Sequence, residues 1–316
     1  MTSSEVKKGI MKMSVKKKKS KNTKHQRRQN ILFAIIFIVG MLVAVYPLVS
    51  RFYYRIETNS QVADFESERS KLTDKDLDHR MELAKAFNDS LRNVVEKDPY
   101  SDEMKQEGRA EYARMLEIHE RMGHIEIPTI NLDIPIYAGS SEEVLQKGAG
   151  HLEGTSLPIG GNSTHAVITA HTGLPTAKLF TNLTKVKKGD KFYVHNIKET
   201  LAYQVDQIKV VEPTEFSDLL IVPGHDYVTL LTCTPYMINT HRLLVRAHRV
   251  PYVKAVDEKL IAENKLSYLY RNLFYASLVL IVILLFIVRQ LRKKKKQAEN
   301  KLEAILPKTL LSGEED

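Results

Sequence analysis

Two long runs without a charged side chain lie near the ends of this 316-residue chain and constrain its architecture more than any other feature. The first run covers residues 31–50, about the 20 residues that a helix needs to cross the hydrocarbon core of a membrane. The second covers residues 272–288, near the short end of that range, and Tyr268, Tyr270 and Tyr275 lie at its start like an interfacial aromatic belt. The sequence therefore predicts two transmembrane helices with a large block between them.

A cleaved signal peptide is the alternative for the first run. The run follows a long basic segment, as signal peptides do, but its apolar core is longer than that of a typical signal and no clear A-x-A cleavage site follows it. We therefore expect an uncleaved membrane anchor.

Positive charge is concentrated outside the two runs. Residues 1–30 carry a net charge of +10 and residues 289–316 carry +3, so the remaining residues carry −4 of the total of +9. By the positive-inside rule, both termini are predicted to be cytoplasmic tails of a two-pass protein of the cell membrane, and residues 51–271 to be exported. A nucleic-acid-binding domain gathers positive charge on a folded face, so the expected charge partner is the lipid surface and not nucleic acid.

The first part of the exported block has helical periodicity. Between residues 61 and 122 apolar side chains recur at helical spacing, and the break at residues 96–101 contains Asp98-Pro99, where the residue before proline is biased away from helix. Thr73 followed by Asp76 resembles a capping box at the start of the first helix. Two helices joined by a proline-containing loop are predicted here, and a further helix is expected over residues 253–271.

From about residue 123 the pattern of residue types becomes that of a β domain. At least seven short runs are rich in β-branched and aromatic residues and are bounded by turn residues. They cover residues 124–128, 134–137, 166–170, 191–194, 202–211, 227–232 and 242–249. This density of strands predicts a closed or sandwiched antiparallel sheet.

A single cysteine, Cys233, excludes an intrachain disulfide and a multi-cysteine zinc site. It ends one predicted strand, Arg242 begins the next strand, and His171 ends another. A thiolate attacks carbonyl groups, an imidazole protonates a leaving amine, and a guanidinium stabilises an oxyanion. The residues alone leave two interpretations open: a cysteine nucleophile with these partners, or a small core cysteine with an ordinary histidine and a surface arginine.

Three motifs resemble those of the sortase family. Residues 229–236 (TLLTCTPY) with residues 239–246 (NTHRLLVR) resemble the sortase signature, residues 169–175 (TAHTGLP) resemble its histidine motif, and residues 147–156 are also similar. Sortases are membrane-anchored cysteine transpeptidases of Gram-positive bacteria. The helical N-terminal extension, the Asp-Pro-aromatic loop and the second apolar run resemble class C, the pilus-assembly sortases, although Ala247 stands where class C chains commonly carry glycine.

The resemblance implies a mainly β fold. A closed eight-stranded barrel over residues 123–252 is expected to follow a helical region over residues 51–122, and two transmembrane helices are expected to flank this exported part. It also implies that Cys233 is the nucleophile, that His171 protonates the leaving group and activates the incoming amine, and that Arg242 holds the substrate carbonyl or oxyanion. No cofactor and no metal are expected.

Asp98, Pro99 and Tyr100 match the class C lid. In that lid the aspartate pairs with the catalytic arginine and the aromatic ring covers the catalytic cysteine, which shields the thiol. The alternative, which composition alone favours, is that these residues form a loop that breaks the helix and has no further function.

The activity implied is cleavage of an LPxTG-like sorting signal between threonine and glycine, followed by transfer of the acyl group to a pilin lysine. Pilin subunits that carry such a signal are therefore the expected partners. The alternatives are a sortase that anchors proteins to a peptidoglycan amine and a non-catalytic adhesion module with a structural cysteine. Among lesser candidates, Thr232 is weighed as an oxyanion donor, whereas His151 and His165 are expected to be structural.

Overall fold

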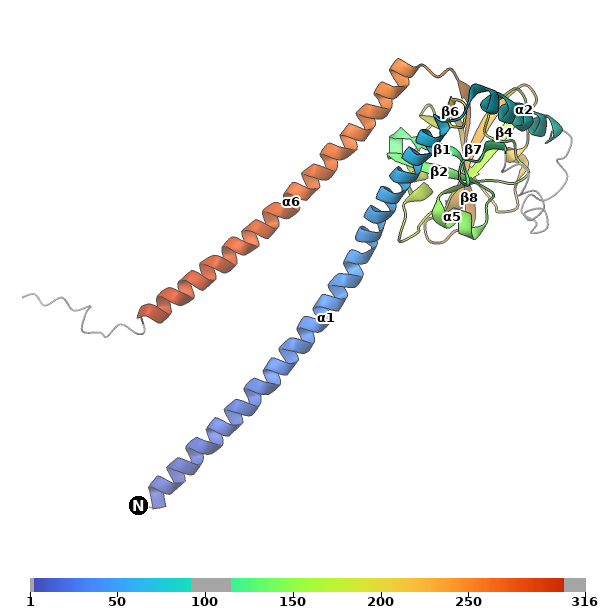
Figure 1. The fold of residues 1–316 in the computed structure, drawn as a ribbon. Coiled ribbons are helices and arrows are strands. Elements are labelled where there is room, and N and C mark those ends of the chain that lie inside the picture. Colours follow the sequence, from blue (N-terminus) through green and yellow to red (C-terminus); the bar gives the residue numbers. More distant parts are fainter. Residues whose placement is uncertain (1–2, 92–114, 304–316) are drawn as a thin grey trace, which may run out of the picture. The chain divides into compact units, whose positions relative to one another are not determined.

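Eight strands close into a barrel in the computed structural model, which describes residues 3–91 and 115–303 (Figure 1). The order around the barrel is β1-β2-β3-β4-β7-β8-β6-β5. The strands are β1 (Arg121–Ile127), β2 (Leu132–Ala138), β3 (Ala149–His151), β4 (Thr164–Thr169), β5 (Lys191–His195), β6 (Thr200–Val211), β7 (Asp226–Thr234) and β8 (His241–Val250). The predicted closed eight-stranded barrel is confirmed.

The helices are α1 (Ser3–Arg69), α2 (Asp74–Leu91), α5 (Glu142–Lys147) and α6 (Lys254–Glu303), and three short 3-10 helices are η1 (Pro128–Ile130), η2 (Leu179–Lys185) and η3 (Ser217–Leu219). The cap predicted for α2 is present: Thr73 Oγ1 accepts a hydrogen bond from the Asp76 backbone N–H at 3.3 Å and donates one to Asp76 Oδ2 at 2.6 Å. The first bond satisfies one of the free N–H groups at the start of the helix, and the second orients the Thr73 hydroxyl.

The expectation of a purely antiparallel sheet is wrong. All seven expected strands form, but β2 pairs with β3 in parallel, and β4 pairs with β7 in parallel. Parallel neighbours need a long crossover, which α5 supplies between β2 and β3 and which β5 and β6 supply between β4 and β7. The eighth strand, β3, has three residues, too few for alternation to be visible in the sequence.

The barrel is filled with aliphatic and aromatic side chains. Its largest cluster of buried residues includes Ile125, Ile168, Leu230 and Val245, one from each of four strands. All six residues of β4 are buried, so both faces of this strand are covered by protein. Strands buried on both faces are typical of parallel pairing, and β4 is the strand that leads to His171.

A second apolar cluster joins the N-terminal helices to the barrel. Phe65 of α1 and Ala84 of α2 are buried there with Met122 and Leu157. Asn88 of α2 adds two hydrogen bonds to the backbone of Leu157. Its Nδ2 donates to the Leu157 carbonyl at 3.2 Å, and its Oδ1 accepts from the Leu157 N–H at 2.7 Å. Helices α1 and α2 therefore pack on the barrel through both apolar and polar contacts. The predicted loop over residues 96–101 and most of the second predicted helix lie outside the described residues.

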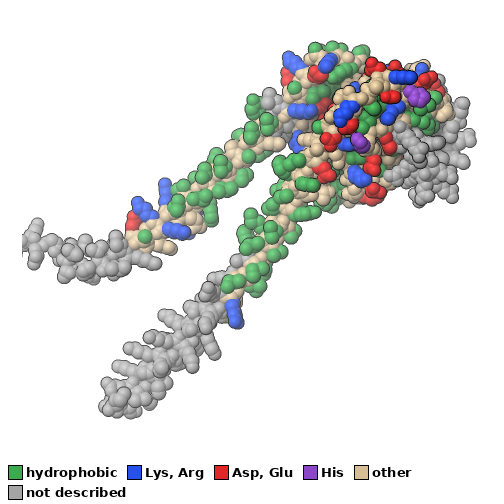
Figure 2. Space-filling model, viewed as in Figure 1, with side chains coloured by type: hydrophobic (Ala, Val, Ile, Leu, Met, Phe, Trp, Pro, Cys, Tyr) green, Lys and Arg blue, Asp and Glu red, His purple; other side chains and the backbone are tan. Residues whose placement is uncertain are grey.

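Both uncharged runs lie on helices long and apolar enough to cross a membrane (Figure 2). The side chains described in each apolar window are not buried against the rest of the protein, which distinguishes them from a soluble core helix. In α1 the helix continues past the first run to Arg69 without a break. The second run lies in α6, where the expected helix over residues 253–271 and the run form one continuous helix.

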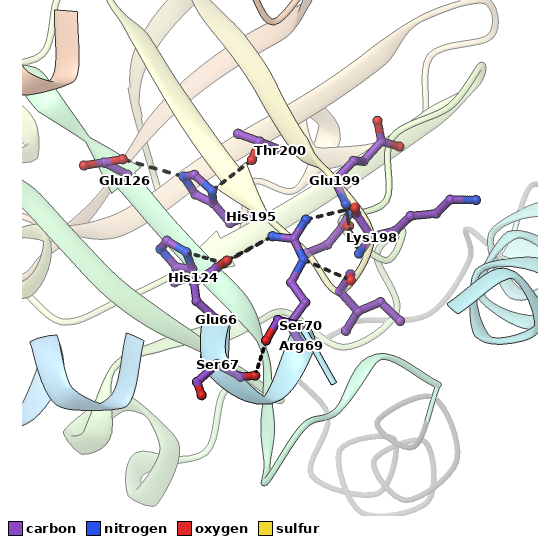
Figure 3. A network of polar contacts seen from close by, with 12 residues as sticks. Glu66, Ser67, Arg69, Ser70, His124, Glu126, His195, Lys198, Glu199 and Thr200 are labelled. Atoms are coloured by element: carbon purple, nitrogen blue, oxygen red, sulfur yellow. Dashed lines mark hydrogen bonds and ion pairs between the residues drawn. The ribbon is translucent and has the colours of Figure 1, made fainter. Parts of the chain in front are cut away.

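A polar network attaches the end of α1 to the barrel (Figure 3). Glu66 Oε1 lies 3.2 Å from His124 Nε2, and the other nitrogen of that ring, Nδ1, lies 2.7 Å from Asp133 Oδ1. Arg69 donates hydrogen bonds to the carbonyl oxygens of Ile197 and Lys198 at 3.1 and 2.9 Å. The helix that carries the first apolar run is thus bound to the outside of the barrel.

Candidate active site

Cys233 lies at the end of β7, where the barrel opens to solvent. The residues of β7 from Tyr227 to Thr232 are buried, whereas Cys233 and Thr234 are partly exposed. Cys233 is a free cysteine. Its position at the rim makes the sulfur atom a candidate for contact with a substrate.

Arg242 lies directly opposite Cys233. Strands β7 and β8 are antiparallel, and Cys233 is paired with Arg242 in their register. The Arg242 guanidinium is held by its own loop, because Nη1 donates hydrogen bonds to the carbonyl oxygens of Asn239 and His241 at 3.1 Å each. A guanidinium has five N–H donors in a planar arrangement, which suits it to bind an anionic or carbonyl oxygen.

His171 reaches the same rim through the parallel pair β4 and β7. The last register pair is Thr169 with Leu231, so His171 and Cys233 each follow it by two residues in the same direction. A backbone hydrogen bond from Ala170 N to Leu231 O, 3.2 Å long, continues the pairing past the end of β4. The structure therefore places the three residues that the sequence singles out at one rim, at or just beyond the ends of three neighbouring strands.

Thr232 stabilises this arrangement from below. Its side chain is buried, and its hydroxyl donates a 2.7 Å hydrogen bond to the Ala170 carbonyl. The hydroxyl considered above as an oxyanion donor is thus committed to a backbone oxygen. This bond connects Thr232, the residue before the cysteine, to Ala170, the residue before the histidine.

The loops that follow Cys233 and His171 lie against each other. Gly173 has φ +81°, and a Cβ placed there would lie 3.4 Å from Tyr236 Cε2 and 3.5 Å from Met237 Sδ. Tyr236, Met237 and Ile238 are exposed apolar side chains in the loop that follows the cysteine. They give this rim an apolar border beside its polar groups.

Glu142 is a member of this site that the sequence reasoning missed. His171 Nε2 lies 3.1 and 3.2 Å from the two carboxylate oxygens of Glu142, the first residue of α5. The two residues are 29 positions apart, and no local pattern links them. The contact exists because α5 crosses over from β2 to β3 beside the end of β4.

His151 and His165 are structural, as expected. His151 Nε2 lies 2.8 Å from the Ser156 carbonyl, and His165 Nε2 lies 2.7 Å from Thr229 Oγ1. Burial lowers the pKa of each histidine to about 4, which keeps both rings neutral at physiological pH. Asp98, Pro99 and Tyr100 lie outside the described residues, so the lid stays a prediction.

One group of potential metal ligands occurs among the described residues. Glu66, His124 and His195 each offer a ligand atom, and these atoms lie within 4.8 Å of one another. The two imidazole rings are stacked, with centroids 4.1 Å apart and planes 5° apart, so their lone pairs run parallel and do not converge on one ion. Asp133 and Glu66 on the two nitrogens of His124 suit a buried imidazolium better than a metal ligand.

Comparison with known proteins places this arrangement in a family. The family model described as the sortase domain matches residues 125–250. The crystal structure of sortase C-1 from Streptococcus pneumoniae is 78% identical and aligns over 61% of this chain and 100% of that chain, with a TM-score of 0.58. A pilus-related sortase C of Group B Streptococcus is 68% identical over 60% of this chain and 97% of that chain, with a TM-score of 0.56. Sortase A of Staphylococcus aureus is 30% identical over 173 residues, which are 54% of this chain and 77% of that protein.

Proposed function

This chain belongs to the sortase family, and we propose that it is a class C transpeptidase that joins pilin subunits through an acyl intermediate on Cys233. The observation that carries the proposal is the position of Cys233 at the barrel rim, opposite Arg242 in the β7–β8 register and level with His171 across β4 and β7. Similarity to a pilus-related sortase C over 97% of that chain supports the class and the choice of pilins as substrates.

The first half of the reaction cleaves the sorting signal. The Cys233 thiolate attacks the threonine carbonyl carbon of an LPxTG-like motif, and the guanidinium of Arg242 stabilises the oxyanion that forms. When this intermediate collapses, the bond from the carbonyl carbon to the glycine nitrogen breaks and His171 gives its proton to the departing amine. A thioester between the threonine and Cys233 remains.

The second half transfers the acyl group. The side-chain amine of a pilin lysine attacks the thioester carbonyl and gives up a proton to His171. The carbon–sulfur bond then breaks, which restores the Cys233 thiolate and leaves an isopeptide bond between two subunits. His171 thus acts first as an acid and then as a base, and returns to its initial protonation state.

The same proposal includes the membrane topology. The helices that carry residues 31–50 and 272–288 cross the membrane, and the basic segments beyond them keep both termini in the cytoplasm. The barrel then works outside the membrane, where pilins are exported.

The test is mass spectrometry of the full chain in detergent micelles with a sorting-signal peptide. An acyl adduct on Cys233 is expected, with none on Cys233→Ala, and Arg242→Lys should lower kcat about 100-fold because the planar pair of donors is lost. Two acceptors separate the alternatives: transfer to a lysine-containing pilin peptide supports pilin polymerisation, whereas transfer only to a peptidoglycan-type amine supports wall anchoring. A chain that forms no adduct at Cys233 contradicts the transpeptidase mechanism itself.

A further inference from the structure

The carboxylate of Glu142 faces His171 with both of its oxygens, at 3.1 and 3.2 Å from Nε2. We propose that Glu142 is a positioning residue, which holds the His171 ring in the orientation from which it gives a proton to the glycine amine. This inference rests on the proposed function, because it assigns a role to a neighbour of the proposed acid. Glu142 is then the third group, which orients the acid–base partner of the nucleophile.

The carboxylate is itself held in place. Gln146, one helical turn later in α5, donates a 2.6 Å hydrogen bond from Nε2 to Glu142 Oε1. This bond lowers the pKa of Glu142, and the neighbouring His171 lowers it further, so the carboxylate is ionised throughout the neutral range. An oriented anion is what a positioning role requires.

The segment that carries Glu142 is also anchored at both ends. Ahead of α5, the Ser140 N–H and hydroxyl donate hydrogen bonds of 3.0 and 2.7 Å to the buried carboxylate of Glu153. Within the helix Val144 is buried, and at its end Tyr54 of α1 donates a 2.9 Å hydrogen bond to the Lys147 carbonyl. Glu142 therefore approaches His171 from a fixed support and not from a free loop.

The ionisable groups around His171 come from four elements. Glu142 faces the ring from α5, Cys233 and Arg242 lie at the same rim on β7 and β8, and Arg51 of α1 donates to the carbonyl of Pro175 in the loop after the histidine. Glu142 supplies the carboxylate among these groups, and both of its oxygens lie against the ring.

Glu143 offers a matched control on the same helix. It carries the same charge, shares the first turn of α5, and forms its ion pair with Lys147 at 3.0 Å. Glu143→Gln therefore reproduces any effect of charge on the helix itself, without touching His171. Glu142→Asp keeps the charge and shortens the side chain.

The experiment measures kcat and KM for the full chain in detergent micelles, with a sorting-signal peptide and a lysine acceptor. We expect Glu142→Gln to lower kcat/KM about tenfold, through kcat and not through KM. Glu142→Asp should recover part of the loss, and Glu143→Gln should match the wild type.

Three results are decisive. An unchanged kcat/KM for Glu142→Gln, in a chain whose Cys233 still forms the acyl adduct, overturns the positioning role and leaves the proposed function intact. Equal losses for Glu142→Gln and Glu143→Gln also overturn it, since the effect then belongs to the charge of the helix. A wild-type chain with no adduct on Cys233 overturns the proposed function, and the positioning role with it.

Discussion

Thr232 shows how one buried hydroxyl can connect the chain segments that carry two candidate catalytic residues. It lies between the barrel core and Cys233, and its hydrogen bond to the Ala170 carbonyl joins the chain just before the cysteine to the chain just before the histidine. The backbone pairing of β4 with β7 ends at Thr169 and Leu231. Beyond that point the Thr232 side chain supplies a hydrogen bond between the two chain segments.

Thr232→Val removes this hydroxyl and keeps the shape of the side chain. The Ala170 carbonyl then loses a partner in a buried setting, which should lower the free energy of unfolding by about 1–2 kcal/mol. The measurement is chemical denaturation of the full chain in detergent, together with the rate of acyl-adduct formation, which should also fall. Thr232→Ser keeps the hydroxyl and serves as the control; equal stability of the valine variant and the wild type would refute the role.

At the scale of elements, three neighbouring strands and the loops after them form the candidate site. Strands β4, β7 and β8 carry His171, Cys233 and Arg242 to one rim, and the loop residues Gly173 and Tyr236 hold the first two strand ends against each other. Strand ends placed in this way expose functional side chains while the barrel keeps the backbone rigid.

Gly173→Ala tests the contact between the two loops. At φ +81° a side chain of L configuration costs about 1 kcal/mol, and the added methyl group pushes against Tyr236 and Met237. We expect activity to fall about tenfold, because small displacements at reacting groups are costly.

Gly224→Ala is the matched control for this variant. Gly224 also has φ +81°, but nothing lies within 4 Å of its added Cβ. Both variants should lose about 1 kcal/mol in denaturation experiments, and only Gly173→Ala should lose activity. If both variants keep full activity, the loop contact has no part in catalysis.

At the scale of the whole molecule, α1 connects the first apolar run to the barrel. Past the end of that run, Arg51 and Tyr54 donate hydrogen bonds to the carbonyls of Pro175 and Lys147, beside the candidate site. Further along, Glu66 meets the buried His124. The helix thus links the first apolar run to the candidate site first, and to the far strands of the barrel afterwards.

The His124 contact predicts a pH dependence of stability. Burial by itself lowers the pKa of His124, but the hydrogen bonds to Asp133 and Glu66 outweigh it and raise the pKa to about 9. In the unfolded chain the value is about 6.5, so the folded state binds the extra proton above that pH. The stabilisation is complete below about pH 6.5 and is lost as the pH rises through about 9.

The measurement is the melting temperature of the full chain in detergent between pH 6 and pH 9.5. It should fall across this window for the wild type, and His124→Gln should be less stable at pH 6 and show a flatter profile. His79→Gln, on the exposed surface of α2, should keep the wild-type profile. A wild-type melting temperature that stays constant from pH 6 to pH 9.5 would rule out a buried imidazolium at His124.

Local features of this protein were determined by the sequence itself. Residues 31–50 and 272–288 need only length and the absence of charge to be recognised as apolar helices, and seven of the eight strands are visible as runs of β-branched and aromatic residues. The Thr73 cap depends on residues three positions apart. Cys233, Arg242 and His171 could be singled out because their motifs are contiguous.

Tertiary structure alone decided the features that join distant segments. The parallel pairing of β4 with β7 depends on closure of the barrel, and so does the meeting of Glu142 with His171, 29 residues away. The contact of Glu66 with His124 spans 58 residues and needs α1 to pack on the barrel before it exists. Periodicity reports which face of an element is apolar, whereas these contacts depend on which elements become neighbours when the chain closes on itself.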